Sequence, residues 1–168
     1  MMLRKLVGAL GFAALLVSSS SINAQVWTAT ASTGAVEDTA IGNYAASSSY
    51  LTFRAAATGT VAANYNVTNP LDTSSSPAWT TMQFTARNPG GSAATFAQAV
   101  LYRVPKGTAS SASSVCIALA PATGAVSTTT CTFSSSLIDF NNYRYFVRVL
   151  LSRDSTASIV AAYEIRIF

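Results

Sequence analysis

Side chains able to carry acid–base chemistry are few in this sequence, and histidine is missing from it. Histidine is the commonest general base, the usual partner of a serine or cysteine nucleophile, and the commonest metal ligand. After the first 24 residues a single lysine remains, Lys106, between a proline and a glycine that indicate a loop tip. A lysine that activates a nucleophile must be buried so that its pKa falls, so we expect Lys106 to be solvated and non-catalytic.

Carboxylates offer the remaining route to catalysis, because most glycoside hydrolases need two of them beside the substrate. The acidic residues are Glu37, Asp38, Asp72, Asp139, Asp154 and Glu164. They lie in polar segments, among turn residues or on an outward strand face, and no Asp-x-Asp-x-Asp-Gly calcium loop occurs. We therefore expect no catalytic residue, no metal site and no cofactor. One alternative function, the second of two, is that of a carboxylate-dependent glycoside hydrolase.

Aromatic side chains provide the binding chemistry, since an exposed ring beside polar groups can stack on a sugar. In a strand over 79–85, Trp79 would share one face with the polar residues Thr81, Gln83 and Thr85. The residues predicted to bind a glycan are Trp79, Tyr44, Tyr50 and Tyr65. The competing interpretation is that Trp79 covers the end of the core or a subunit contact, because large aromatic residues are mostly buried.

We expect β-strands to position these side chains. Apolar and polar residues alternate with a period of two in much of the sequence, and helical patterning is weak. Over 143–151, apolar residues share one face while Arg144 and Arg148 share the other, where they should meet solvent or a neighbouring carboxylate. Segment 159–168 resumes the alternation, so we expect the two segments to pair as a C-terminal hairpin. Further candidate strands are 50–56, 61–67, 78–87, 94–104, 115–119, 128–133 and 137–140.

Cys116 and Cys131 are the only cysteines, and an even pair predicts a disulfide when the chain enters an oxidising compartment. Both lie in strand-like segments, and 121–124 between them carries turn residues. A symmetric hairpin centred on that turn would place the cysteines directly opposite each other. Because the CxxC context of a redox pair is missing, we expect a structural bridge.

The N-terminus has the pattern of a secretory signal peptide. Arg4 and Lys5 precede an apolar run over 6–17, which is shorter than the ~20 residues needed to span a bilayer. We expect cleavage after Ala24, leaving 25–168 as a single domain without a transmembrane helix. The expected location is periplasmic, cell-surface or extracellular. Only 10% of residues are charged and no basic run occurs, so we expect no nucleic-acid partner.

The C-terminal third contains the segments Asp139-Phe140-Asn141-Asn142-Tyr143-Arg144-Tyr145-Phe146-Val147 and Tyr163-Glu164-Ile165-Arg166-Ile167. In these residues it resembles a group of exported bacterial β-sandwich proteins of unknown function. This resemblance implies an exported β-sandwich and brings no activity with it.

These patterns together predict an all-β fold, an antiparallel β-sandwich of jelly-roll type joined by the disulfide. The expected function is that of a secreted, non-catalytic structural or adhesive protein. Self-association is expected through edge strands that few charges protect. The first alternative is a carbohydrate-binding module that uses the aromatic residues named above, so the expected partners are further copies of the chain or a surface glycan.

Overall fold

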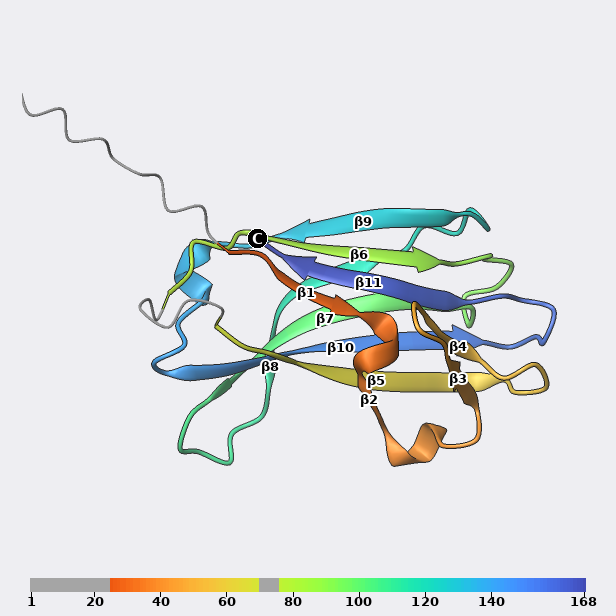
Figure 1. Ribbon diagram of the computed structural model, residues 1–168, viewed down its shortest axis with the longest axis horizontal. Coiled ribbons are helices and arrows are strands. Elements are labelled where there is room, and N and C mark those ends of the chain that lie inside the picture. Colours follow the sequence, from red (N-terminus) through yellow and green to blue (C-terminus); the bar gives the residue numbers. More distant parts are fainter. Residues whose placement is uncertain (1–24, 70–75) are drawn as a thin grey trace, which may run out of the picture.

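A computed structural model describes residues 25–69 and 76–168 (Figure 1). The predicted signal peptide (1–24) and Asp72 lie outside the described residues. The first sheet has the order β3-β4-β11-β6-β9, with β1 also paired to β11, and the second has the order β2-β5-β10-β7-β8. The strands of the first sheet are β1 (Trp27–Thr30), β3 (Tyr44–Ala46), β4 (Leu51–Phe53), β6 (Thr81–Arg87), β9 (Val126–Thr132) and β11 (Ala161–Ile167). Those of the second are β2 (Ala35–Val36), β5 (Gly59–Val67), β7 (Phe96–Pro105), β8 (Ser113–Leu119) and β10 (Tyr143–Arg153).

Strands β4 to β11 have jelly-roll topology. They form the two four-stranded paths β4-β11-β6-β9 and β5-β10-β7-β8, in which neighbouring strands are antiparallel. Of the connections between these eight strands, only β7–β8 stays within one sheet, whereas the others cross the sandwich. This order is that of two interlocked Greek keys. The predicted antiparallel jelly-roll sandwich is therefore confirmed.

The core lies between the sheets and follows from the alternation in the sequence. Along β10, Val147, Val149 and Leu151 are fully buried, while Arg148 between them is partly exposed. Phe84 of β6 faces them from the other sheet's inner side and is also fully buried. Burial of each such side chain contributes ~1.5–3 kcal/mol, so the inward residues drive the packing of the two sheets.

The predicted C-terminal hairpin is wrong. Strand β10 pairs with β5 and β7, whereas β11 pairs with β1, β4 and β6 in the opposite sheet. The connection 154–160 crosses between the sheets, and the buried guanidinium of Arg153 holds it by donating to the carbonyls of Ser158 and Ala57. Alternation shows which face of a strand is buried, but it does not show which strand lies beside it.

The cysteines form the predicted disulfide, but the predicted hairpin is wrong here too. Cys116 lies opposite Leu101 in the second sheet, and Cys131 lies opposite Met82 in the first. Their side chains bridge the two sheets, with the Cα atoms 5.9 Å apart. The bond therefore joins two edge strands, β8 and β9, across the sandwich instead of closing a two-stranded turn.

Short 3-10 helices lie in three connections: η1 (Ala31–Thr33), η2 (Asp38–Ala40) and η3 (Ser135–Leu137). The strand predicted over 137–140 is not formed, because the N–H groups of Leu137 and Ile138 donate to carbonyls three residues earlier and that of Asp139 donates to a side-chain hydroxyl. The Asp139 carboxylate accepts hydrogen bonds from the Asn142 side chain and from the backbone N–H groups of Asn141 and Asn142. These bonds, led by the Asn142 side chain, hold the pKa of Asp139 below its usual value. Among the described residues, no helix is long and apolar enough to cross a membrane.

Candidate functional site

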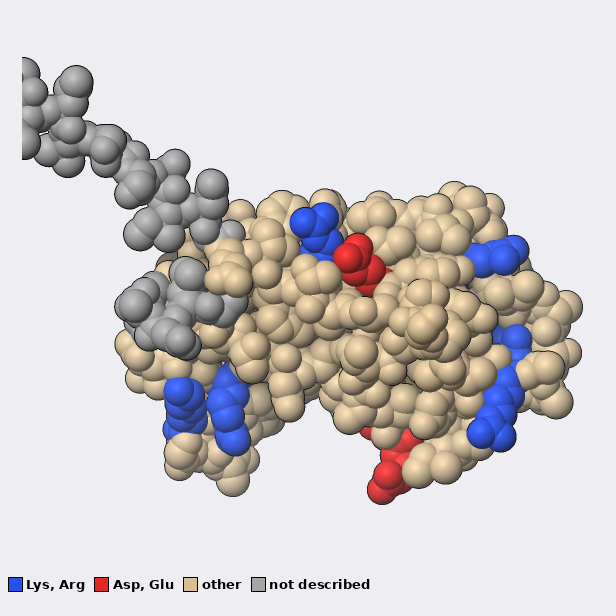
Figure 2. Space-filling model, in the orientation of Figure 1, with Lys and Arg blue, Asp and Glu red and all other residues tan. Residues whose placement is uncertain are grey.

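The outer face of the second sheet is hollowed between two raised segments, the one after β2 and the loop that precedes β8. Figure 2 shows the lower outline of the molecule indented between the β7–β8 loop and the segment around η2. The hollow has a volume of about 430 Å³, within the range of ligand sites. We call it the outer groove. It is lined by Glu37, Asn64, Asn66, Tyr102, Ala112, Phe146 and Arg148.

A stacked aromatic pair lies in the outer groove. Tyr102 of β7 is directly opposite Phe146 of β10 in the strand register. Their rings are 5.1 Å apart between centroids and nearly parallel, at 16°. Both side chains are half-buried, because they point away from the core while their neighbours Leu101 and Val147 point into it. The same row continues to Asn66 on β5, so a ring platform lies beside an amide.

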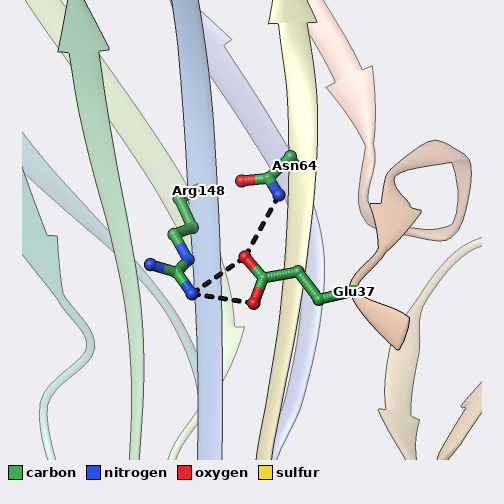
Figure 3. A network of polar contacts seen from close by, with 3 residues as sticks. All are labelled: Glu37, Asn64 and Arg148. Atoms are coloured by element: carbon green, nitrogen blue, oxygen red, sulfur yellow. Dashed lines mark hydrogen bonds and ion pairs between the residues drawn. The ribbon is translucent and has the colours of Figure 1, made fainter. Parts of the chain in front are cut away.

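One row along the sheet, a charged network fixes the wall of the outer groove (Figure 3). Nη2 of Arg148 is 2.8 Å from each carboxylate oxygen of Glu37, and Nδ2 of Asn64 donates to Oε1 of Glu37 at 3.2 Å. The backbone N–H of Glu37 donates to the carbonyl of Ala62, which ties this segment to β5. The expectation that an outward arginine would meet a neighbouring carboxylate is confirmed for Arg148.

The network also leaves hydrogen-bonding capacity for a ligand. Both oxygens of Glu37 are engaged by the same Arg148 nitrogen, and no partner for Nη1 of Arg148 occurs among the described residues. The side chains of Arg148 and Glu37 are 37% and 33% exposed. A pair of this exposure contributes at most ~1 kcal/mol to stability.

The four residues predicted to bind a glycan do not lie on one surface. Trp79 is fully buried, and its Nε1 donates to the carbonyl of Gln25 at 2.9 Å. Tyr65 is 4% exposed, its hydroxyl donates to a backbone carbonyl, and burial raises its pKa. Tyr44 is half-buried on β3, and only Tyr50 is clearly exposed. The competing interpretation, in which Trp79 belongs to the core, matches its position.

Tyr102 and Phe146 were not among the residues predicted to bind a ligand, although the alternation of their strands indicates that both point outward. Phe146 falls between Arg144 and Arg148 on the outward side of its strand, and Tyr102 falls on the outward side of 94–104. An aromatic residue at an outward position is the kind of exposed ring that binds sugars. The contact between the two rings depends on the pairing of β7 with β10, which the local pattern did not give.

The carboxylates and the lysine are dispersed over the described residues. Glu37 is the acidic residue of the outer groove, whereas Asp154 accepts hydrogen bonds from Ser92 and Thr95 elsewhere. Lys106 is exposed and donates from Nζ to the carbonyl of Phe140. No group of three His, Cys, Asp or Glu side chains within 25–69 and 76–168 is placed to hold a metal ion.

No protein-family model and no curated protein sequence matches the chain. Among solved structures, it is similar to one described as "xylan-binding module CBM15", with a TM-score of 0.49 and 17% identity, over 86% of this chain and 95% of that chain. It is also similar to a chain from "Structure of infectious bursal disease virus Gx strain", with a TM-score of 0.38 and 15% identity. That match covers 96% of this chain and 36% of the virus chain. Both likenesses are distant, and the jelly roll is defined by the strand order itself.

Proposed function

We propose that this protein is an exported, non-catalytic module that binds a glycan chain in the outer groove. The observation that best supports this proposal is the stacked, half-exposed pair Tyr102 and Phe146, which lies beside a fixed network of polar side chains. Sugar rings present an apolar face of C–H groups and a rim of hydroxyls. An aromatic platform with adjacent amide, carboxylate and guanidinium groups matches both features.

The aromatic and polar lining residues have different roles in this proposal. The rings of Tyr102 and Phe146 pack against the apolar face of a sugar. Asn66 and Asn64 supply amide donors and acceptors for its hydroxyls. Nη1 of Arg148 donates to a ligand oxygen, while Glu37 keeps the guanidinium in place. The wall residues are held before binding, which lowers the entropy cost of ordering them.

Truncation of the platform is expected to weaken glycan binding. Tyr102→Ala or Phe146→Ala should raise the dissociation constant about tenfold, equivalent to ~1.4 kcal/mol, because each removes ring contact with the sugar. The measurement is affinity electrophoresis against a panel of neutral polysaccharides, followed by calorimetry with oligosaccharides of the one retained. Glu37→Gln should also weaken binding while changing stability by less than ~1 kcal/mol.

Val126→Ala is the matched control for these variants. Val126 is a 53% exposed apolar residue on β9, in the opposite sheet. Binding should be unchanged in this variant. Equal binding by the native protein, Tyr102→Ala and Phe146→Ala would contradict the outer groove as the site. Failure of every polysaccharide to retain the native protein would contradict glycan binding itself.

The compartment and the absence of catalysis belong to the same proposal. A disulfide between the sheets is typical of proteins that fold in an oxidising compartment, which supports export. The outer groove has one carboxylate, Glu37, among its lining residues, whereas a glycoside hydrolase of the common type uses two. This supports a binding role for the groove in preference to a hydrolytic one.

Self-association is a second candidate function, which the edge strands favour. Ile117 and Leu119 of β8 are 54% and 55% exposed, and β8 ends the second sheet. An exposed edge strand with apolar side chains and no charge is open to pairing with another copy. Light scattering during size-exclusion chromatography should then show dimers or larger species that Ile117→Lys converts to monomers. A monomer at every concentration would remove this candidate.

A further inference from the structure

A second hollow lies on the other side of the sandwich, over the outer face of the first sheet. It has a volume of about 540 Å³ and lies over β4, β11 and the end of β6, beside the β10–β11 connection. Ala161 lines it and is paired in register with Thr52 on one side and Arg87 on the other, so these residues of β4, β11 and β6 lie side by side.

The charge of this second hollow is positive. Arg87 and Arg153 line it, and no acidic residue does so among the described residues. Figure 2 shows basic side chains, without an acidic one beside them, along the end of the face drawn where the β4–β5 and β10–β11 connections lie. Glu164 on β11 is paired in register with Thr85 and does not line the hollow.

Arg153 provides a buried positive charge without a carboxylate partner. Its side chain donates to five backbone carbonyls, and it is 4% exposed. The acceptors are Arg54, Ala55, Ala57, Thr156 and Ser158. The carboxylate of the next residue, Asp154, is bonded to Ser92 and Thr95 instead. Burial lowers the pKa of Arg153, as expected for a cation that an anion does not neutralise.

Arg87 is the cation that a ligand can reach. Its Nε donates to the carbonyl of Gly124 at 2.9 Å, which fixes the guanidinium on the outer face of β6. No partner for its two Nη groups occurs among the described residues. An arginine held by one nitrogen, with its other N–H groups available, is suited to a carboxylate, which it binds in a bidentate fork.

Two tyrosines complete the second hollow. The rings of Tyr50 and Tyr163 have centroids 5.9 Å apart and are tilted by 51°. Both line the hollow, and Tyr50 is 38% exposed. Tyr163 faces outward at the register shift between Ala162 and Glu164, where β11 contains an extra residue relative to β6. The bulge therefore brings an aromatic ring to the same hollow as Arg87.

We infer that the second hollow binds an acidic sugar, a uronic acid unit of a polysaccharide, with its carboxylate on Arg87 and its ring against Tyr50 and Tyr163. The two arginines favour a negatively charged ligand, and the two tyrosine rings favour a ligand with a ring that can pack against them. A sugar that carries a carboxylate has both features. This site is separate from the outer groove, because the two hollows have no lining residue in common. It goes beyond the proposed function and does not require it.

Calorimetry with a polygalacturonate oligosaccharide tests this inference, with the same oligosaccharide after reduction of its carboxyl groups as the neutral probe. The native protein should bind the acidic form and should bind the reduced form at least tenfold more weakly. Arg87→Gln and Tyr163→Ala should each weaken binding of the acidic form about tenfold. Higher salt should weaken it as well, since the interaction is a partly exposed ion pair.

Arg166→Gln is the matched control, because Arg166 is also an outward arginine of the first sheet but lies beside Phe168. It should leave binding unchanged. Equal losses in Arg87→Gln and Arg166→Gln would indicate a nonspecific charge effect and would overturn the site, as would equal binding of the acidic and reduced sugars. Tyr102→Ala should weaken only neutral glycans, so failure of one site is distinguishable from failure of the other.

Discussion

Replacement of Trp79 by alanine is expected to lower the free energy of unfolding by ~3–5 kcal/mol, the largest effect of any single substitution considered for this chain. Trp79 is fully buried and contacts Phe140 edge-on, with ring centroids 5.9 Å apart. Truncation would leave a cavity at this end of the core and would also remove the hydrogen bond from Nε1 to Gln25. The loss is large relative to the 5–15 kcal/mol that stabilises a typical domain.

Chemical denaturation followed by circular dichroism measures this effect. Trp79→Phe should lose less stability than Trp79→Ala, because it keeps most of the ring volume. Val126→Ala, at an exposed position of β9, should change stability by less than ~0.5 kcal/mol. At temperatures where Trp79→Ala is still folded, it should bind glycans like the native protein. Normal stability together with lost binding would show that Trp79 is a ligand-binding residue.

Removal of the disulfide is expected to cost ~3 kcal/mol. The bond closes a loop with a sequence separation of 15, and the loop-entropy model gives this magnitude for such a loop. The Cys116→Ala/Cys131→Ala double variant should therefore unfold at lower denaturant concentration than the oxidised native protein. Because Cys116 belongs to the core cluster and Cys131 packs against it, alanine also removes some packing, and the measured loss should be at least this large.

Reduction of the native protein separates the two contributions. Dithiothreitol should destabilise the native protein and should have no effect on the double variant, which has no other cysteine. If reduced and oxidised native protein unfold at the same denaturant concentration, the bond does not stabilise the fold.

The sequence predicted the fold class well because burial in a strand is a local property. Residues 143–151 alternate strictly, and the structure buries the apolar face of that strand. The cysteine pair was also predictable, since the chain contains no other candidate partner. Pairing was not predictable in the same way. Both 143–151 and 159–168 satisfy their alternation whether they lie side by side or in opposite sheets, and the crossing depends on contacts of Arg153 that are distant in sequence.

The candidate site was less predictable than the fold for the same reason. Trp79 was the most conspicuous aromatic residue, but its outward phase was inferred for a strand that begins only at Thr81. Tyr102 and Phe146 are far apart in sequence and become a platform only when β7 pairs with β10. Glu37 reaches Arg148 over 111 positions. Each of these contacts depends on which segments are neighbours in the fold. Alternation along the sequence indicates only which face of its own strand a residue lies on.

The position of the disulfide gives the two margins of the sandwich different mechanical properties. Strands β8 and β9 end their sheets on one side and are cross-linked by the disulfide, whereas β2 and β3 end them on the other side, where the described residues contain no disulfide. The sheets should therefore separate more readily at the β2–β3 margin, where, within the described part of the chain, only backbone connections link them covalently. Glu37 belongs to this untethered margin, while Ala112 precedes the tethered strand. In the proposed binding role, the contacts among Glu37, Asn64 and Arg148 are therefore what holds the groove wall on the margin that has no disulfide.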